Sequence, residues 1–251
     1  MSKAHGAAAE ARARDAAPKP MTRAGHHARL VELLEPRPRG RLLDLPCGQG
    51  ALSQALIQLG FDVTCADIDP GFFRLSGTPW VQANLNAALP FGAEEFDYVA
   101  CIAGLHRLHS PQIAIREFRR VLRPKGTLIV SFPNYAHLRR RLHFLWHGYI
   151  SKGVTLRSFD VQTVEDEDAH FRTTLLWPTV RQLLLANGFA VEQLEPDRRR
   201  ARWLQAPLAA LIRLVGRLTR DESREAYALD EVSSSAILTG GDNLIVVARK
   251  S

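Results

Sequence analysis

LLDLPCGQGALSQAL, the stretch from Leu42 to Leu56, has the pattern of a strand, a tight turn and a helix. Its first residues form a short apolar run, and its last residues have the spacing of an amphipathic helix. The turn between them holds Gly48 and Gly50. A nucleotide-binding turn of the form D-x-G-x-G-x-G would have a further glycine at position 46, where this chain has Pro46. The pattern predicts a strand–turn–helix unit and leaves open whether the turn binds a nucleotide.

On both sides of this unit, apolar runs alternate with segments of helical spacing. We expect strands over residues 41–45, 61–67, 80–85, 96–104, 127–134, 190–196 and 242–250. We expect helices over residues 26–34, 51–60, 111–122 and 179–189. Because strands that alternate with helices form parallel sheets covered on both faces, the chain is expected to have an α/β fold.

Polar side chains stand at the carboxyl ends of three expected strands. Asp44 closes the first strand, Asp67 the second and Asn84 the third. Ligands of open α/β sheets bind at this edge, where glycines let the backbone approach the ligand and the following helix N-terminus favours negative charge. An acidic side chain at the place of Asp67 is suited to accept hydrogen bonds from ribose hydroxyls. These positions favour a nucleotide site over a bare strand–helix turn.

Four motifs in order resemble those of the class I S-adenosylmethionine-dependent methyltransferases, in their small-molecule branch. They are LLDLPCGQG (42–50), VTCADIDP (63–70), NLNAALPFGAEEFDYV (84–99) and GLHRLHSPQIAIREFRRVLRPKGTLIVSFPN (104–134). The resemblance covers about residues 41–135 and resumes at the last helix and strands. It implies a Rossmann-like, seven-stranded, mostly parallel sheet with helices on both faces and an antiparallel last strand. In such a sheet DNLIVVARK (242–250) would pair beside AVEQLEP (190–196).

The resemblance also implies S-adenosylmethionine as cofactor, S-adenosylhomocysteine as its product, and no metal ion. The cofactor-binding residues that it implies lie at four strand ends: Asp44, Pro46, Cys47, Gly48 and Gly50 at the first, Asp67 and Ile68 at the second, Asn84 and Leu85 at the third, and Cys101, Ile102 and Ala103 at the fourth. By analogy with the family, the first group would cradle the methionine part. Asp67 would hold the ribose, with Ile68 against the adenine, and Asn84 would meet the adenine amino group. The fourth group would run along the amino-acid end of the cofactor.

The departures from the family pattern remove no group that this chemistry needs. Pro46 has no N–H, but its carbonyl is expected to accept from the cofactor's ammonium group. Asn84 replaces the usual Asp, and its side-chain oxygen can still accept from an amine. Lys125 replaces a turn glycine, and His106 and Arg107 stand where many relatives have Glu-His. Two other interpretations are a Rossmann-like domain that binds no cofactor and a nicotinamide dehydrogenase. The second is disfavoured because the turn is not G-x-G-x-x-G.

Histidines are the candidates for a general base. Methyl transfer from a sulfonium is an in-line displacement, so the protein mainly positions the acceptor, and a hydroxyl acceptor gains from a base. His106 follows the fourth strand and His137 follows the fifth, so we predict these two as catalytic residues. His109 and His170 are further candidates. For each of them, an ordinary packed or solvated histidine is the commoner explanation.

The segment 136–173 interrupts the strand–helix rhythm after the fifth strand and is expected to form a substrate lid. Its start resembles a pattern of relatives from cell-envelope glycan clusters, through Pro133, Asn134, His137, Arg141, Gly148 and His170. This resemblance favours a lipid- or glycan-linked acceptor. The pattern is also similar to that of a methyltransferase-like family tied to methionine biosynthesis. On the plainer interpretation, Arg139–Arg141 form a solvated helix face and the apolar residues of 142–146 pack against the lid.

The second insertion, 197–240, contains a basic amphipathic segment. Seven arginines between positions 198 and 220 accompany leucines near helical spacing, and the chain has a net charge of +7. Such a segment can lie on an anionic membrane surface, and it can equally cover a sheet face or a dimer partner. A nucleic acid ranks third, because the chain lacks a zinc cluster or recognised RNA-binding appendage.

The sequence as a whole predicts a disordered leader over 1–20 and one methyltransferase domain over 21–251 with the two insertions. Cys47, Cys65 and Cys101 fit neither a disulfide framework nor a zinc site, which favours reduced thiols in the cytoplasm. We expect methyl transfer to a small-molecule or lipid/glycan-linked acceptor, at oxygen, by a cytoplasmic protein that touches the inner membrane face through 198–220. The alternative is a non-catalytic, methyltransferase-like protein that binds the cofactor and regulates a partner enzyme. The oligomeric state stays open.

Overall fold

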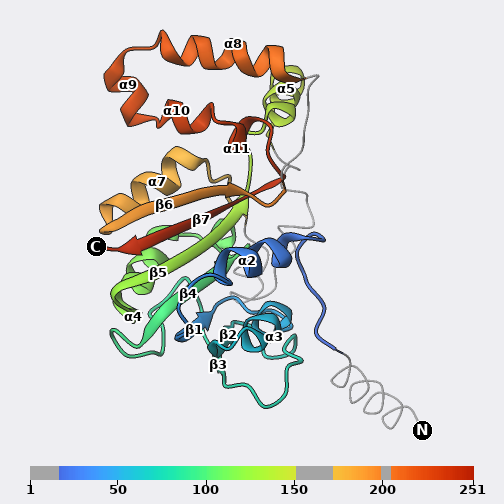
Figure 1. Cartoon of the computed structure of the whole chain (residues 1–251), viewed down its shortest axis with the longest axis vertical. Coiled ribbons are helices and arrows are strands. Elements are labelled where there is room, and N and C mark those ends of the chain that lie inside the picture. Colours follow the sequence, from blue (N-terminus) through green and yellow to red (C-terminus); the bar gives the residue numbers. More distant parts are fainter. Residues whose placement is uncertain (1–16, 151–171, 199–204) are drawn as a thin grey trace, which may run out of the picture.

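The computed structural model describes residues 17–150, 172–198 and 205–251. These residues form a seven-stranded sheet in the order β3-β2-β1-β4-β5-β7-β6 (Figure 1). The strands are β1 (Arg41–Asp44), β2 (Asp62–Asp67), β3 (Trp80–Gln82), β4 (Phe96–Ile102), β5 (Leu122–Pro133), β6 (Phe189–Pro196) and β7 (Asn243–Lys250). The α/β fold class is therefore confirmed.

Strand direction follows the predicted pattern. The pairs β1–β2, β2–β3, β1–β4 and β4–β5 are parallel. The last strand, β7, lies between β5 and β6 and is antiparallel to both. The predicted pairing of 242–250 beside 190–196 is thereby confirmed. The parallel strands β1, β2 and β4 end at one common edge, and this edge carries Asp44 and Asp67.

Two strand boundaries differ from the predicted ones for local reasons. The strand expected over 80–85 ends at Gln82, because the Asn84 side chain accepts a hydrogen bond from the Asn86 N–H at 2.8 Å and turns the chain. The strand expected from 127 starts at Leu122, which pairs with Phe96 across an irregularity. Lys125 in this stretch has φ +63°, which is the left-handed conformation that favours the family's glycine at this position.

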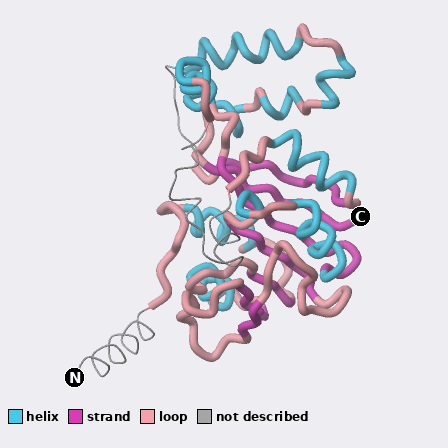
Figure 2. Tube along the Cα trace, turned by 180° about the vertical axis from the view of Figure 1, so that it is seen from behind, coloured by secondary structure: helices cyan, strands magenta, loops and turns pink. Residues whose placement is uncertain are grey.

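Helices cover both faces of the sheet (Figures 1 and 2). Those of the first half of the chain are α2 (His26–Leu34), α3 (Ala51–Gln58), the 3₁₀ turn η1 (Leu105–Arg107), α4 (Pro111–Val121) and α5 (Leu138–His147). Those of the second half are α7 (Trp177–Ala186), α8 (Ala206–Arg217), α9 (Asp221–Ala226), α10 (Leu229–Val232) and α11 (Ser235–Leu238). The core clusters show that α2 and α3 pack on one face, and α4 and α7 on the other.

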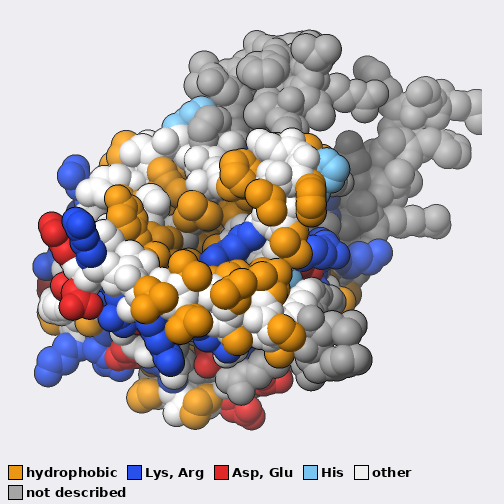
Figure 3. Space-filling view, turned by 90° about the horizontal axis from the view of Figure 1, so that it is seen from above, with side chains coloured by type: hydrophobic (Ala, Val, Ile, Leu, Met, Phe, Trp, Pro, Cys, Tyr) orange, Lys and Arg blue, Asp and Glu red, His pale blue; other side chains and the backbone are white. Residues whose placement is uncertain are grey.

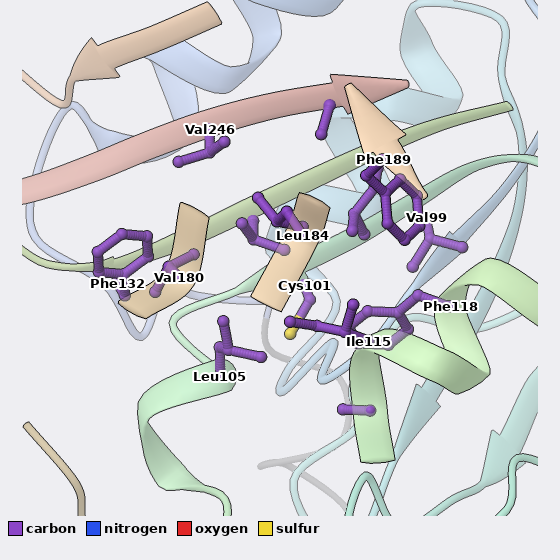
Figure 4. Packing of buried hydrophobic residues seen from close by; sticks show 14 of the residues in the cluster. Val99, Cys101, Leu105, Ile115, Phe118, Phe132, Val180, Leu184, Phe189 and Val246 are labelled. Carbon is purple, nitrogen blue, oxygen red and sulfur yellow. The ribbon is translucent and has the colours of Figure 1, made fainter. Parts of the chain in front are cut away.

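Alternation along the strands divides the core between these faces. In β4, Val99 and Cys101 point to the α4 and α7 side, whereas Ala100 and Ile102 point to the α2 and α3 side. Figure 4 shows the α4 and α7 side, where Phe118 of α4 lies among strand and helix side chains. Because both faces are covered, the strands are nearly continuous apolar runs, as the sequence indicates.

Phe118→Ala is expected to lower the free energy of unfolding by about 3–5 kcal/mol, because it empties a close-packed site. The Phe118 side chain is 0% exposed. Ile113→Ala on the same helix is the matched control, since Ile113 is 39% exposed. Its cost should stay below about 1 kcal/mol. Urea unfolding curves measure both values, and equal costs would contradict the burial described for α4.

The described part of the second insertion folds into α8, α9, α10 and α11, which form a layer beyond β6 (Figure 1). Asn134, at the end of β5, holds this layer with its side-chain N–H groups, which donate to the Ile237 carbonyl at 2.8 Å and the Gly241 carbonyl at 3.3 Å. Arg141 of α5 donates to the Val232 carbonyl at 3.0 Å. Most of the predicted lid, residues 151–171, lies outside the described residues, as do 1–16 of the predicted leader.

Candidate active site

A cavity of about 460 Å³ opens at the carboxyl ends of β1, β2 and β4. It collects most of the residues that the sequence predicts for the cofactor: Asp44, Pro46, Cys47, Gly48, Asp67, Ile68, Asn84, Leu85, Ile102 and Ala103. Four predicted residues are not among those lining it, namely Gly50, Cys101, His106 and His137. The volume lies in the usual range for small-molecule sites. The strand ends that the sequence singles out therefore meet at one place.

The glycine turn is held by backbone hydrogen bonds on both sides of Pro46. The Leu45 N–H donates to the Ala100 carbonyl at 3.0 Å, and the Cys47 N–H donates to the Ala66 carbonyl at 2.9 Å. The turn is thereby fixed between β4 and β2 without a donor from position 46. The Pro46 ring packs against Gly104, where an added Cβ would lie 2.5 Å from Pro46 Cδ. Pro46 therefore forms a wall of the cavity and leaves the path of the turn intact.

The two glycines of the turn are required by backbone conformation and by space. Gly48 has φ +54° and Gly50 has φ +88°, both in the left-handed region. A Cβ on Gly50 would come within 3.0 Å of Leu75 Cβ and 3.2 Å of the Phe73 ring. A Cβ on Gly48 would meet the Met21 sulfur at 3.1 Å. Gly50 thus supports the turn from behind, which explains why it does not line the cavity. Gly48 lines the cavity, and its lack of a side chain lets a ligand approach the backbone there.

Asp67 joins β2 to the glycine turn. One carboxylate oxygen accepts from the Gly48 N–H at 2.8 Å, and the other accepts from the Asp69 N–H at 3.3 Å. The side chain is 8% exposed and lines the cavity. A carboxylate has about four lone-pair positions, so Asp67 retains acceptor capacity for the two hydroxyls of a ribose.

Asp44 is a buried carboxyl group on the cavity wall. Its side chain accepts from the Ser53 hydroxyl at 2.6 Å and is 1% exposed. Burial raises the pKa of Asp44 to about 7, the Ser53 hydrogen bond opposes this shift, and the nearby Asp67 charge adds to it. A cationic group in the cavity would favour the ionised form. The site therefore suits a ligand with a positive charge beside Asp44.

The ends of β3 and β4 complete the cavity. The Asn84 side-chain oxygen accepts from the Asn86 N–H, and Asn84 lines the cavity beside Leu85. At the end of β4, Ala103 has φ +55°, and its N–H donates to the Ser131 carbonyl at 3.1 Å and the Ser131 hydroxyl at 3.0 Å. Cys101 points into the opposite core, where burial raises the pKa of its thiol to about 12.

Neither histidine predicted as catalytic lines the cavity. His106 lies in η1, and burial, followed by the charges of Arg107 and Arg172, lowers the pKa of its imidazole to about 4. Arg107 lines the cavity in its place. His137 is 4% exposed and caps α5, since its Nδ1 accepts from the Arg139 N–H at 3.1 Å. His170 lies outside the described residues.

His27 is a cavity residue that the sequence does not single out. It lies in the first turn of α2, and its buried Nδ1 has no hydrogen-bond partner among the described residues. Burial, with a smaller contribution from the charge of His26, lowers the pKa of His27 to about 4. The imidazole is therefore neutral near pH 7 and can accept a proton. The segment HHARLVELL indicates only an amphipathic helix. The one sequence feature that could have pointed to His27 is the position of a histidine pair at the start of that helix.

The chain before α2 runs along the same cavity. Lys19, Met21 and Thr22 line it, and the Lys19 N–H donates to the Gln49 side chain at 2.9 Å. Lys19 belongs to the segment predicted as a leader. The end of this predicted leader therefore contacts the glycine turn through Lys19.

The segment that resembles glycan-cluster relatives has a structural role in its described part. Asn134 and Arg141 bond carbonyls of the second insertion, and His137 caps α5. None of these three residues is among those lining the cavity. Gly148 ends α5 with φ +72°. Asn134 and Arg141 of this segment therefore attach the α8–α11 layer to the rest of the fold.

No cluster of three or more His, Cys, Asp or Glu side chains in the described part of the chain is placed to hold a metal ion. None of the helices described there is long and apolar enough to cross a membrane.

Comparison with known proteins agrees with the motifs. Residues 43–130 match the methyltransferase domain family. A ubiquinone biosynthesis O-methyltransferase of Xanthomonas campestris is 33% identical over 124 residues, covering 46% of this chain and 52% of that protein. The chain thus spans about half the length of that relative. A ubiquinone/menaquinone biosynthesis C-methyltransferase of Shewanella frigidimarina is 28% identical over 176 residues, covering 63% of this chain and 70% of that protein.

The fold agrees as well. The crystal structure of an S-adenosylmethionine-dependent methyltransferase from Thermotoga maritima superposes with a TM-score of 0.55 at 13% identity, covering 90% of this chain and 92% of that one. With the sheet order, the glycine turn and the strand-end acids in place, the chain carries a methyltransferase domain over residues 43–130 and has the fold of the class I S-adenosylmethionine-dependent methyltransferases.

Proposed function

We propose that the protein transfers a methyl group from S-adenosylmethionine to a hydroxyl oxygen of a small or lipid-linked acceptor. The observation that carries this proposal is the convergence of Asp44, Asp67 and the glycine turn on one cavity. The relatives named for quinone biosynthesis support an acceptor of that class, an aromatic ring with an apolar tail. Such a molecule is small at its reacting end and lipid-like at the other.

The residues that would hold the cofactor follow from the geometry of the cavity. Asp67 would accept from the ribose hydroxyls, and Ile68 would pack on the adenine. Asn84 offers its remaining acceptor capacity to the adenine amino group. Asp44 and the Pro46 carbonyl would face the ammonium group. When bound, the cofactor supplies a methyl group on a positively charged sulfur, which is a good leaving group. The chain itself then has to position the acceptor and exclude water.

We propose His27 as the base that accepts the acceptor's hydroxyl proton. It lines the cavity and is neutral near pH 7, and both conditions are needed for that role. His106 and His137 remain predictions, and since neither is among the residues lining the cavity, His27 is favoured.

His27→Gln is expected to lower turnover by about 10²–10⁴-fold, while the Kd for S-adenosylmethionine stays within about twofold. The assay measures formation of S-adenosylhomocysteine with catechol and other hydroxylated aromatic acceptors. His109→Gln is the matched control, since His109 is exposed and is not among the residues lining the cavity. An unchanged rate in His27→Gln, with a large loss in His106→Gln, would assign the base to His106 instead.

The second candidate is a non-catalytic protein that binds the cofactor and regulates a partner enzyme. Binding of S-adenosylmethionine without product formation, over a broad panel of acceptors, would favour it. Methylation of RNA or protein is the third. Methylation of RNA or protein would need the arginines between 198 and 220 to be free to bind the substrate. Two of them are engaged inside the fold, since Arg198 pairs with Asp242 at 3.1 Å and Arg213 donates to the Ser233 carbonyl at 3.0 Å. Arg199, Arg200 and Arg202 lie outside the described residues.

Contact with the inner face of an anionic membrane, by a protein that resides in the cytoplasm, completes the proposal. A lipid-linked acceptor resides in a membrane, so the protein has to meet it there. The arginines engaged inside the fold contribute less to such a contact than the sequence indicates. The exposed apolar side chains nearby are the stronger argument.

A further inference from the structure

We propose that α5 and α8 together form a membrane-docking surface for bilayers with anionic headgroups. The α5–α8 surface consists of six exposed apolar side chains: Leu145, Trp146, Leu211, Leu214, Val215 and Leu218. The docking step itself is independent of methyl transfer. Its purpose, delivery of a lipid-linked acceptor to the cavity, rests on the proposed function.

Helix α8 carries an apolar stripe on its outer side. Leu211, Leu214, Val215 and Leu218 follow the i, i+3, i+4, i+7 spacing of one helix face, and their side chains are 54–78% exposed. On the inner side, Ala209 is only 1% exposed. A helix normally buries such a stripe, and apolar patches left open on a folded protein mark interaction sites. The stripe therefore has a partner outside the described fold.

Helix α5 adds a second group of exposed apolar side chains. Leu145 is 71% exposed and Trp146 is 77% exposed, whereas Leu138 at the start of the helix is buried. Near the end of α5, the ring of His143 lies 4.5 Å from that of His147 and 4.7 Å from that of Tyr149. Tryptophan and tyrosine favour the boundary between water and lipid, because their rings are apolar and carry one polar group.

The two helices are fastened to the same turn of the fold. Arg141 of α5 donates to the Val232 carbonyl, and Arg213 of α8 donates to the next carbonyl, that of Ser233, each at 3.0 Å. Figures 1 and 2 place α5 at one end of α8, on the outer layer of the molecule. These arginines hold the helices to the fold, and the apolar side chains of the α5–α8 surface stay exposed.

The charges around the surface favour a bilayer with anionic headgroups as its partner. Arg139, Arg217 and Arg220 are exposed on α5 and at the end of α8. Figure 3, which looks onto this face, shows hydrophobic side chains gathered there with Lys and Arg among and beside them. The acids of α9 begin directly after Arg220, and the first of them, Asp221, pairs with Arg224 at 3.1 Å. An apolar stripe with basic residues beside it is the pattern of a helix that lies on an anionic membrane.

Tyr135 links the start of α5 to the lining of the cavity. The Arg140 guanidinium of α5 lies 4.9 Å from the centre of the Tyr135 ring. Tyr135 in turn interacts electrostatically with Arg172, which lines the cavity together with Arg107. The start of α5 is therefore connected through Tyr135 to a residue of the cavity lining. We expect the apolar tail of a lipid-linked acceptor, held in a bilayer at α5, to lead toward this side of the cavity.

Vesicle cosedimentation tests the docking. We expect the full chain to sediment with vesicles of phosphatidylcholine and phosphatidylglycerol, and at least about tenfold more weakly with phosphatidylcholine alone. Leu214→Glu combined with Leu218→Glu should lower partitioning by about tenfold or more, and so should Leu145→Glu combined with Trp146→Glu. Leu185→Glu is the matched control, because Leu185 is 42% exposed on α7, away from the surface.

A thermal melt and a titration with S-adenosylmethionine accompany each variant, so that loss of docking is separated from loss of the fold. Vesicle binding without cofactor binding would leave the docking intact and remove the proposed function. Absence of vesicle binding in the unchanged protein would overturn the docking. So would a dimer in solution that the same substitutions dissociate and that binds no vesicles, because the surface would then serve a second copy of the chain.

Discussion

Asp67→Ala is expected to weaken binding of S-adenosylmethionine by at least about 100-fold. The substitution removes the acceptor for the ribose hydroxyls. It also removes the oxygen that accepts from the Gly48 N–H at 2.8 Å and so fixes the glycine turn. A loss of both contacts corresponds to about 3 kcal/mol or more of binding free energy. Isothermal titration calorimetry of the purified protein measures the effect.

Two variants define the cause of that loss. Asp67→Asn keeps an oxygen that can accept from Gly48 but loses the charge, so it should fall between the unchanged protein and Asp67→Ala. Asp62→Ala lies at the other end of β2, where the side chain is 73% exposed, and it should leave the Kd unchanged. Equal affinity in Asp67→Ala and the unchanged protein would show that the ribose is held elsewhere.

The affinity for S-adenosylmethionine is expected to rise with pH through a single proton released by Asp44. Burial raises the pKa of Asp44 to about 7, so the free protein binds a proton there at lower pH. The positively charged ligand favours the ionised carboxylate and expels that proton. Affinity should therefore fall about tenfold for each pH unit below about pH 7 and level off above it. Calorimetry in phosphate and in Tris, whose ionisation heats differ, counts the protons released.

The same group gives a stability prediction of opposite sign for the free protein. The pKa of Asp44 is raised above its ordinary value, so the folded form binds more protons than the unfolded form between about pH 4 and pH 7. Its contribution to stability is present below that window and is lost as the pH rises through about 7. Asp44→Asn should remove both effects. Proton release that persists in Asp44→Asn would assign the linkage to another group.

The cofactor side of the site was predictable because it follows from short-range patterns. Asp44, Asp67 and Asn84 each end a strand, and parallel strands bring their carboxyl ends to one edge. Pro46 was the open question, since it removes a glycine from the turn. The structure answers it through the neighbouring N–H groups of Leu45 and Cys47, which hold the turn on either side. That arrangement depends on β2 and β4, which the turn sequence alone does not contain.

The acceptor side was not predictable because it depends on contacts between distant segments. His27 reaches the cavity from a helix that precedes the first strand, and its sequence indicates only helix packing. Asn134 and Arg141 are polar residues near the expected pocket, yet their partners are carbonyls about a hundred positions later in the chain. Periodicity also shows that α8 has an apolar stripe without showing whether another element covers it. Only the packing of the fold decides that.

The most direct test is a calorimetric titration of the full chain with S-adenosylmethionine and then with S-adenosylhomocysteine. We expect saturable binding of each ligand at one site, with competition between the two. This would show that the Pro46 turn works as a cofactor loop. The experiment uses protein concentrations at which a micromolar Kd is easily measured. If neither ligand produced a binding isotherm, the assignment of this cavity as a cofactor site would be contradicted.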